Sequence, residues 1–500
     1  MSRYLTRRLA QTTASLRLSS GRRCYSAKAS FDWKDPLNSK SLLTEEEVAI
    51  SETAERYCQE KLAPRVLGTL RVRFLDLVIV SRAILSEMGE LGLLGATISG
   101  HGCAGVSTVA GALITRAVER VDSGYRSGMS VQSSLVMGGI DYWGSTEQKE
   151  RFLPQMAAGK LLGAFGLTEP NHGSDPASME TVARPHPTKK GFYSLSGSKT
   201  WITNSPIADI LLVWAKLADG EGPSKIRGFL VERKNCPPGT LETPAIKNKT
   251  GLRASLTGMI HLDNCPIPEE NMFPTVTGLK GPFTCLNSAR FGIAMGVMGA
   301  LEDCIAATRE YALERSQFGR PLASFQLVQK KLADAATDAA YGSLAAIQVG
   351  RLIDEGKSVP DMISMVKREN CDRALRNART LQEVLGGNAV SDEYRIGRHV
   401  ANLFVTQTYE GQSDIHSLIL GRAVTGIQAL LRWVVIGDGS LASFVFHRDV
   451  GSESPLRVKP HAQPYCQFYY VGDCRALHLT KKEMCFAQSR QRVAQPPQLG

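Results

Sequence analysis

Two polar segments, each attached to a predicted strand, carry residues suited to holding a flat, hydrogen-bonding ligand. Residues 161–176 begin as an apolar strand and then enter a turn of Thr, Asn, Gly, Ser and Asp. Residues 199–206 add an indole and a further hydroxyl. A strand that runs into such a turn places hydroxyls and free backbone N–H groups around one point. The two segments together therefore predict a cofactor site, although either alone is typical of an ordinary turn.

A carboxylate in an apolar approach forms a second candidate centre. Residues 405–416 contain Glu410 between Tyr409 and Gly411, at the start of the helical run 412–430. Burial raises the pKa of a carboxylate and makes it a better base. An acid at this position can instead cap the helix that follows it, and the residue types alone favour that interpretation.

Three regions of different periodicity must position these residues. Helical patterns fill the chain before residue 158, short apolar strands with Pro and Gly turns fill 160–275, and long helical runs return over 280–430. This order of elements predicts an α+β chain. Its predicted parts are an N-terminal helical domain (32–158), a middle β-barrel-like domain (159–275) and a C-terminal four-helix bundle (276–430).

Two segments fit this organisation poorly. Residues 74–80 are apolar and β-branched inside an otherwise helical region. Residues 431–500 lose helical periodicity and gain Gly, Pro, His and Cys. We predict that residues 431–500 are an atypical, disordered tail, and we assign them no function.

The formal net charge of +11 comes from the two ends of the chain. Residues 1–31 hold six Arg, one Lys and no acid, and residues 431–500 hold nine basic and five acidic residues, so residues 32–430 are neutral. A neutral body without an aromatic and basic patch argues against nucleic-acid binding. A leader rich in Arg, Ser and Thr and free of acids is typical of a mitochondrial transit peptide, which predicts the mitochondrial matrix.

Cysteine spacing and hydropathy exclude further classes of protein. The eleven cysteines include no C-x-x-C pair, so the sequence predicts neither a zinc site nor a disulfide framework, and no other metal site. There is no run of about 18 apolar residues, so we expect no transmembrane helix.

Taken together, residues 161–176 and 199–206 resemble the flavin-binding middle domain of the acyl-CoA dehydrogenase family, and the resemblance extends over residues 31–430. It implies that family's fold, FAD as the cofactor, a homotetramer, and electron-transferring flavoprotein as the electron acceptor. The implied contacts to the flavin and its phosphates are Phe165, Leu167, Thr168, Gly173, Ser174, Trp201, Ile202 and Thr203. The implied contacts to the adenine half, across a subunit interface, are Arg315, Phe318, Gln326, Glu383, Leu385, Gly386 and Gly387.

The resemblance also implies the catalytic base, because residues 409–411 match the family segment whose Glu removes the α-proton of an acyl-CoA. Glu410 is that residue here. The enolate that forms requires hydrogen-bond donors at the thioester oxygen, which the family supplies from this backbone N–H and a flavin hydroxyl. Gln412 stands where a Thr is usual near the flavin, and we expect it to retain a hydrogen bond there. The implied contacts to the acyl-CoA are Ser174, Phe283, Leu286, Asn287, Arg290 and Gly411.

The acyl group is predicted from residues 119–132. Acyl pockets in this family are apolar at their far end, where Arg126 is costly unless an anion pairs with it. A distal carboxylate of a dicarboxylic acyl group would be such an anion, with Ser127 and Ser130 nearby and Glu119 tuning the charge. The segment resembles family members that act on glutaryl-CoA, and this implies oxidative decarboxylation to crotonyl-CoA and CO2 in lysine, hydroxylysine and tryptophan breakdown. A surface pairing of Arg126 with Asp122 or Glu119 is the alternative.

Three other functions remain open from the sequence. A non-decarboxylating dehydrogenase of short or branched acyl-CoA predicts an apolar residue at position 126, which this chain lacks. An acyl-CoA oxidase differs in being reoxidised by oxygen, and the transit-like leader favours the dehydrogenase over it. A catalytically impaired flavoprotein scaffold is favoured by the two atypical segments, but the intact Glu410 opposes it.

Overall fold

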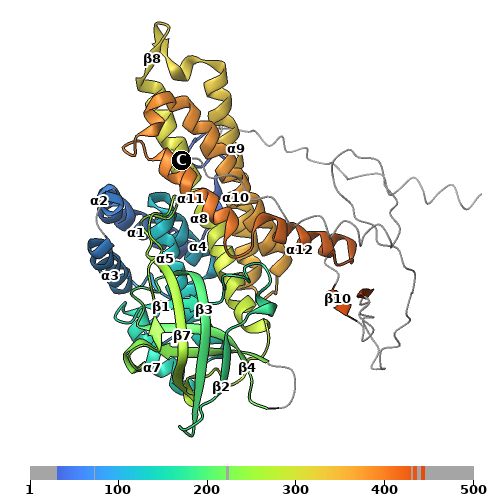
Figure 1. The fold of residues 1–500 in the computed structure, drawn as a ribbon. Coiled ribbons are helices and arrows are strands. Elements are labelled where there is room, and N and C mark those ends of the chain that lie inside the picture. Colours follow the sequence, from blue (N-terminus) through green and yellow to red (C-terminus); the bar gives the residue numbers. More distant parts are fainter. Residues whose placement is uncertain (1–30, 72–73, 221–224, 430–431, 436–440, 445–500) are drawn as a thin grey trace, which may run out of the picture. The chain divides into compact units, whose positions relative to one another are not determined.

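The computed structural model describes residues 31–71, 74–220, 225–429, 432–435 and 441–444. The chain divides into one unit over 1–430 and a second over 431–500. Within the first unit, a helical region, a sheet and a helix bundle follow one another (Figure 1), so the predicted α+β class is confirmed. The predicted transit peptide lies outside the described residues except for Phe31.

The N-terminal region begins with a well-capped helix. The Thr44 hydroxyl accepts from the Glu47 backbone N–H, while the Glu47 side chain accepts from the Thr44 N–H. This reciprocal pair satisfies donors that a helix start leaves free. The helices are α1 (Glu45–Tyr57), α2 (Val66–Arg71), α3 (Phe74–Glu90), α4 (Thr108–Val121), α5 (Ser123–Ser130), α6 (Gly138–Trp143) and α7 (Thr146–Ala157), with π-helical turns at Cys58–Leu62 and Val131–Met137.

The atypical run 74–80 is helical and forms the first turns of α3. Leu77 and Val78 are partly buried against the main core, which also contains Met88 from the same helix. A helix that can place apolar side chains on a core overrides the weak β preference of branched residues. The segment therefore belongs to the same continuous helix as Met88.

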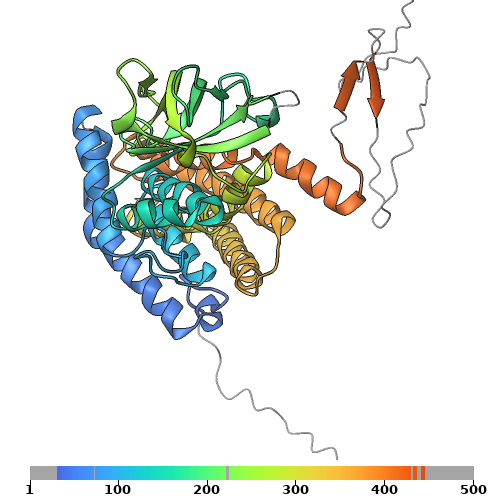
Figure 2. The same ribbon diagram turned by 90° about the horizontal axis from the view of Figure 1, so that it is seen from below.

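The sheet is mixed, and its long strands β3 and β7 form its antiparallel centre. Strands β1 and β2 follow each other along one edge of β4, both parallel to it, and β5 lies along the other edge. The strands are β1 (Gly163–Gly166), β2 (Val182–Pro185), β3 (Phe192–Thr203), β4 (Ile210–Leu217), β5 (Lys225–Glu232), β6 (Leu241–Glu242) and β7 (Thr257–Pro268). The sheet packs against the helices of the first unit (Figure 2), and one core cluster contains residues of both the sheet and the N-terminal helices.

The C-terminal bundle is built around α8, whose residues are mostly buried. By length and composition α8 could cross a membrane, but 83% of its most apolar window is buried inside the protein, as in a core helix. A hairpin of β8 (Ser316–Gln317) and β9 (Arg320–Pro321) joins α8 to α9. The helices are α8 (Lys280–Glu314), α9 (Gln326–Asp354), α10 (Pro360–Gln382), α11 (Ile396–Thr408) and α12 (Ser413–Thr425), with a 3-10 segment at Glu383–Val390.

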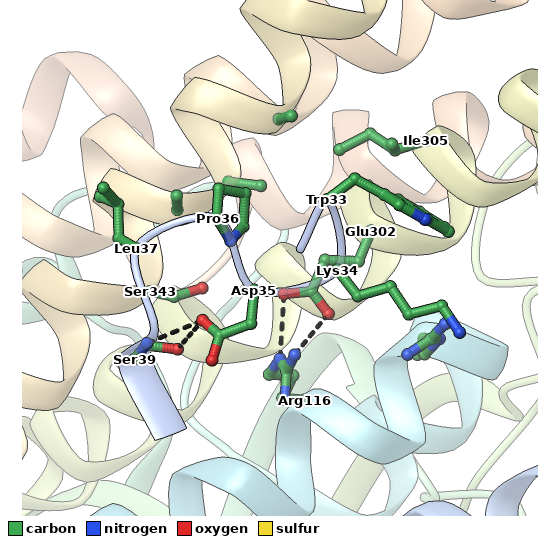
Figure 3. Close-up of a pocket in the computed structure, with 14 residues that line it drawn as sticks. Trp33, Lys34, Asp35, Pro36, Leu37, Ser39, Arg116, Glu302, Ile305 and Ser343 are labelled. Atoms are coloured by element: carbon green, nitrogen blue, oxygen red, sulfur yellow. Dashed lines mark hydrogen bonds and ion pairs between the residues drawn. The ribbon is translucent and has the colours of Figure 1, made fainter. Parts of the chain in front are cut away.

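The segment before α1 lies across α4, α8 and α9 and encloses a small cavity (Figure 3). Arg116 pairs with Glu302 at 2.8 Å on its floor, and the Arg309 guanidinium stacks 4.8 Å from the Trp33 ring. None of the residues predicted to bind a cofactor or substrate lines this cavity. The segment therefore ties the first helical region to the bundle.

In the second unit, two short strands are described, β10 (Arg432–Val435) and β11 (Leu441–Phe444), which pair in antiparallel register. The disordered tail predicted for residues 431–500 stays a prediction beyond these two paired strands. The rest of that predicted tail lies outside the described residues.

Candidate active site

Glu410 lies in the tight turn between α11 and α12. Its φ of 52° and the φ of 101° at Gly411 are both in the left-handed region. A non-glycine residue there is strained and needs support from its surroundings. A Cβ on Gly411 would lie 2.7 Å from Nε2 of His416, so the close approach of the buried imidazole requires a glycine.

Two basic side chains hold the backbone of this turn. The Arg290 Nε of α8 donates to the Glu410 carbonyl at 2.7 Å. The Lys367 Nζ of α10 donates to the carbonyls of Tyr409 and Gly411 at 3.0 and 2.7 Å. Three consecutive carbonyl groups are thus satisfied by cations from two other helices, which fixes the position of the Glu410 backbone.

The Glu410 carboxylate has the environment of a base. Its Oε2 is enclosed and makes no hydrogen bond to any described residue. Burial raises the pKa of Glu410 to about 7, although the charges of Arg126, Lys367 and Arg290 act to lower it. A carboxylate with a pKa near the working pH is well matched to proton abstraction.

The capping interpretation of Glu410 is wrong, because Gln412 is the cap of α12. The Gln412 side chain accepts from the Asp414 backbone N–H at 2.8 Å and donates to the Asp414 carboxylate at 3.0 Å. The predicted contact of Gln412 with the flavin therefore competes with these two hydrogen bonds in the structure.

Arg126 is fully buried, so the interpretation as a surface residue is wrong. Its Nε donates to Glu119 Oε2 at 2.6 Å, and one terminal nitrogen donates to the Tyr409 hydroxyl. Although burial opposes the charge, Glu119 and Tyr409 hold the pKa of Arg126 above its usual value. Asp122 has other partners, the Gly124 N–H and the Asn402 amide. Residues 119–130 and 405–416 therefore meet at one buried point.

Two polar groups of α5 have no hydrogen-bond partner among the residues that the structure describes. The second terminal nitrogen of Arg126, Nη1, makes no hydrogen bond among the described residues, which use only Nε and Nη2. The Ser130 Oγ is buried and unpartnered within the same described part of the chain. Buried polar groups without partners point to a polar ligand or water that completes them.

A cavity of about 420 Å³ lies beside the end of α5. Ser130 and Asn287 both line it, together with Met129 and Phe291. The predicted acyl-CoA helix is the start of α8, in which Leu286 is buried and Phe283 is 37% exposed. Ser127, one turn before the cavity, is buried and does not line it.

The two predicted flavin segments meet at the end of the sheet. The Thr200 backbone N–H donates to the Thr168 carbonyl at 2.9 Å, which joins the turn after β1 to β3. The register of β3 against β7 shifts between Lys199 and Ile202, and Trp201 within this bulge has a φ of 61°. A bulge re-aims side chains, and here it leaves the Trp201 indole 63% exposed while Ile202 is buried.

These residues fit a flavin. Among the described residues, the hydroxyls of Thr168, Ser174 and Thr203 make no hydrogen bond, so all three are available to a ligand. Gly173 has open space around it. Phe165 lies in β1 and Leu167 directly follows it, and both side chains are buried next to the turn.

A buried ion pair underlies the Thr168 turn. The Lys199 Nζ donates to Glu169 Oε1 at 2.8 Å and to the Leu167 carbonyl at 3.1 Å. Burial lowers the pKa of Lys199 to about 8. Burial acts to raise the pKa of Glu169, but the charge of Lys199 and the nearby N–H donors outweigh this effect and hold that pKa at about 2. Glu169 also lies near His172 and Glu180 in an arrangement that could hold a metal ion, but its oxygens already accept from Lys199 and Thr181.

The residues predicted for the adenine half gather at the opposite end of the bundle, beside β8 (Figure 1). Lys331 of α9 pairs with Glu383, and Asn388 donates to the Tyr311 hydroxyl of α8, so the three segments lie together. Phe318 at the hairpin tip is 93% exposed. Arg315 and Gln326 are also exposed, Leu385 is buried, and both Gly386 and Gly387 have open space around them. Within one chain, these residues do not contact the segment around Trp201.

Two buried side chains beside Glu410 had no predicted role. Lys367 occupies the buried face of α10, four residues after Ile363 and four before Cys371. A lysine at an apolar position of a helix is a usable signal, because burying its charge requires a reason. His416 is buried with both ring nitrogens unpartnered among the described residues, and burial together with Lys367 and Arg290 lowers its pKa to about 3.

Comparison with known proteins places this fold and site in a family. The N-terminal, middle and C-terminal domain models of acyl-CoA dehydrogenase match residues 44–160, 164–265 and 277–425. An acyl-CoA dehydrogenase of Bacillus subtilis is 34% identical over 345 residues, which are 69% of this chain and 89% of the relative. The chain therefore belongs to the acyl-CoA dehydrogenase family, whose members oxidise acyl-CoA with FAD, and the predicted fold and cofactor are confirmed.

Two solved structures are similar over most of the chain. Glutaryl-CoA dehydrogenase from Mycobacterium smegmatis is 42% identical, with a TM-score of 0.74, covering 79% of this chain and 99% of that chain. A structure of a glutaryl-CoA dehydrogenase from the same organism in complex with FADH2 is 39% identical, with a TM-score of 0.73 and the same coverage.

Proposed function

We propose that this flavoprotein catalyses the oxidative decarboxylation of glutaryl-CoA to crotonyl-CoA and CO2. The carrying observation is the buried Arg126, which is held by Glu119 and Tyr409 next to the base and keeps Nη1 without a partner. An arginine in such a place suits a carboxylate at the end of the acyl chain, because a charged hydrogen bond offsets the desolvation of both groups. The likeness to glutaryl-CoA dehydrogenases supports the same substrate.

Each protein group has a stated task in this reaction. Glu410 removes the proton from the α-carbon, and its own backbone N–H donates to the thioester oxygen as negative charge develops there. Bound FAD supplies the oxidant that takes a hydride from the β-carbon. Arg126 orients the distal carboxylate, whose C–C bond then breaks to release CO2. The protonated Glu410 returns its proton to the γ-carbon of the remaining dienolate, which gives crotonyl-CoA.

The assembly we propose is a homotetramer. The residues around Trp201, near the end of β3, and those around Phe318, in the hairpin that begins with β8, would hold opposite halves of FAD. Figure 1 shows β3 and β8 well apart within one chain. A second copy that brings its hairpin to the first copy's sheet would complete the site. The exposed Phe318 ring and the unpartnered side chains of Arg315 and Gln326 support this arrangement.

The cellular role is proposed from chemistry and composition. Electrons would pass to electron-transferring flavoprotein, and the acid-free basic leader supports import into the mitochondrial matrix. Glutaryl-CoA oxidation there would serve lysine, hydroxylysine and tryptophan breakdown.

A second candidate function is dehydrogenation of a short or branched acyl-CoA without decarboxylation. The observation that favours it is the ion pair of Arg126 with Glu119, which leaves this end of the pocket without net charge. A neutral pocket end attracts a substrate carboxylate less strongly than a free guanidinium does. The open Nη1 of Arg126 favours the decarboxylating reaction, whereas Glu410 would serve as the base in both reactions.

The test is product analysis with glutaryl-CoA and an artificial electron acceptor. We expect crotonyl-CoA and CO2 from the purified protein, and loss of both in Arg126→Ala, while butyryl-CoA is still oxidised. Arg120→Ala, which removes a neighbouring arginine that lines the Figure 3 cavity, is the matched control. Glutaconyl-CoA without CO2 would establish the second candidate, and no turnover of any acyl-CoA by protein that holds FAD would refute both.

A further inference from the structure

Lys367 is a buried cation without a carboxylate partner. The residue is completely buried in α10, and no ion pair to it exists among the described residues. Its ammonium group donates instead to the Tyr409 and Gly411 carbonyls, at 3.0 and 2.7 Å. An ammonium buried in this way costs free energy that two neutral hydrogen bonds offset only in part. If the role were purely structural, a neutral hydrogen-bond donor would fill it with a smaller desolvation penalty.

We propose that Lys367 is a positioning residue for Glu410, which holds the turn that presents the carboxylate and supplies positive charge that favours its ionised form. The proposal rests on the proposed role of Glu410 as the base. The proposal has two parts: the Lys367 side chain fixes the geometry of the turn, and its charge stabilises the Glu410 carboxylate.

The geometric part follows from which carbonyls are bonded. The two acceptors belong to the residues on either side of Glu410, so one ammonium group fixes the backbone both before and after the base. Glu410 has a φ of 52°, a conformation that surrounding contacts must impose. Arg290 bonds only the carbonyl of Glu410 itself, so it cannot replace the lysine at the two flanking positions. Without Lys367, two carbonyls lose their donor and the turn can relax.

The electrostatic part follows from the charges that face the carboxylate. They are Arg126 from α5, Arg290 from α8 and Lys367 from α10, while Tyr409 and His416 are the other titratable groups beside it. Burial, reinforced by Lys367 and Arg290, lowers the pKa of His416 to about 3, so this ring is neutral at working pH. Arg126 is already paired with Glu119. Lys367 and Arg290 are therefore the unpaired cations at the base, and Arg290 is also predicted to contact the substrate.

The experiment compares three variants of the full chain. Lys367→Met keeps the length of the side chain and removes its charge and donors. Lys367→Gln keeps a donor without the charge, and Lys367→Arg keeps both. Lys249→Met is the matched control, because Lys249 also donates to a backbone carbonyl, that of Ser255 at 2.9 Å, away from Glu410. For each variant, FAD content, kcat, KM and the pH dependence of kcat/KM with the preferred acyl-CoA are measured.

For Lys367→Met we expect FAD content near that of the unmodified protein and a kcat at pH 7 that is lower by about 10- to 100-fold. Loss of the positive charge raises the pKa of Glu410, so the acidic limb of the pH profile moves up by about one pH unit or more. Lys367→Gln should show the same shift with a smaller loss of kcat, and Lys367→Arg should recover both quantities. An acidic limb that stays in place in Lys367→Met and Lys367→Gln would overturn the proposal, whatever the change in rate.

A second readout separates this proposal from the proposed function. Difference infrared spectroscopy follows the protonated carboxyl band of Glu410, identified by its loss in Glu410→Gln, during a pH titration without substrate. If no acyl-CoA is turned over but the titration of this band moves up in Lys367→Met, the enzymatic proposal fails and the role of Lys367 stands. If the protein is active and the band titrates at the same pH in both, the role of Lys367 is refuted.

Discussion

The Tyr409 hydroxyl accepts a hydrogen bond from Arg126, and the Tyr409 ring centroid lies 5.6 Å from the guanidinium carbon. Tyr409 directly precedes Glu410, so one residue connects the group proposed to bind the distal carboxylate with the group proposed to remove the α-proton. The contact joins α5 to the end of α11 across 283 positions of the chain. Substrate selection and proton abstraction are thus placed in one buried cluster.

Removal of this contact tests whether it orients Arg126. In Tyr409→Phe the ring and its packing remain, while the acceptor for Arg126 is lost. A lost hydrogen bond to a charged group costs about 1.5–3 kcal/mol, so kcat/KM for glutaryl-CoA should fall by about 10- to 100-fold. Oxidation of butyryl-CoA, which has no distal carboxylate, should change little. Equal losses for both substrates, measured under the same conditions, would show that Tyr409 does not act through Arg126.

The pH dependence of turnover should report the raised pKa of Glu410. The base must be ionised to accept a proton, so kcat/KM should rise with pH and level off above about 7. Glu410→Gln should lower kcat by at least about 10²-fold, because the amide cannot take the proton. A steady-state pH profile of the unmodified protein that is flat between pH 5 and 9 would contradict this role.

The contribution of Glu410 to the free energy of unfolding should fall as the pH rises, whereas the activity rises. The pKa of Glu410 is about 7 in the folded protein, above the ordinary value of 4.5 for a glutamate. A raised carboxyl pKa contributes stability that is present below the unfolded pKa and is lost as pH rises through the folded pKa. Glu410→Gln should therefore be more stable than the unmodified protein at pH 8, by roughly 1–3 kcal/mol, and similar to it at pH 4. Chemical denaturation at the two pH values measures the difference, and an equal gain at both would exclude a titration effect.

The exposed Trp201 should contribute to cofactor binding and little to folding. Its indole is 63% exposed, so Trp201→Ala should leave the free energy of unfolding of the cofactor-free protein within about 0.5 kcal/mol. Its affinity for FAD should fall by about tenfold, which corresponds to about 1.4 kcal/mol. Fluorescence titration with FAD provides the measurement, with Tyr341→Ala, at another exposed aromatic residue, as the control. Unchanged affinity would remove Trp201 from the flavin site.

The Glu169–Lys199 pair should make the flavin turn sensitive to acid. The pKa of Glu169 is about 2, below the ordinary value of 4.5 for a glutamate. Its stabilising effect is therefore full above the unfolded pKa and is lost as the pH falls through the folded pKa. Removing one partner of a buried pair costs about 3–5 kcal/mol, and Glu169→Gln should lose that amount at pH 7. Glu180→Gln, at an exposed acid nearby, should lose much less. Denaturation curves that coincide for the two variants would refute the structural role of the pair.

Local patterns in the sequence were sufficient for the order of the elements and for the chemical types at the site. The capping box at Thr44, the apolar strand before Thr168 and the turn at Gly411 each depend on residues within one or two turns of one another. Propensity, capping and turn chemistry act over such short separations. For this reason the helical, β and helical regions could be predicted. The Glu, Thr and Trp residues of the site were named from the resemblance to the acyl-CoA dehydrogenase family, because their local patterns also fit a helix cap or an ordinary turn.

The tertiary structure decided which of these residues meet and in which state. Arg126 is buried because the end of α11, far along the chain, packs against α5. The same packing brings Tyr409 to Arg126, which also pairs with Glu119. Likewise, Gln412 rather than Glu410 caps α12, and Lys367 reaches the turn only because α10 packs beside it. The pKa of Glu410 follows from that burial and from three cations on other helices. Desolvation and charge–charge interactions depend on distance in space rather than along the chain. The resemblance could therefore point to Glu410 as the base, but only the tertiary structure provides the environment that suits it to this role.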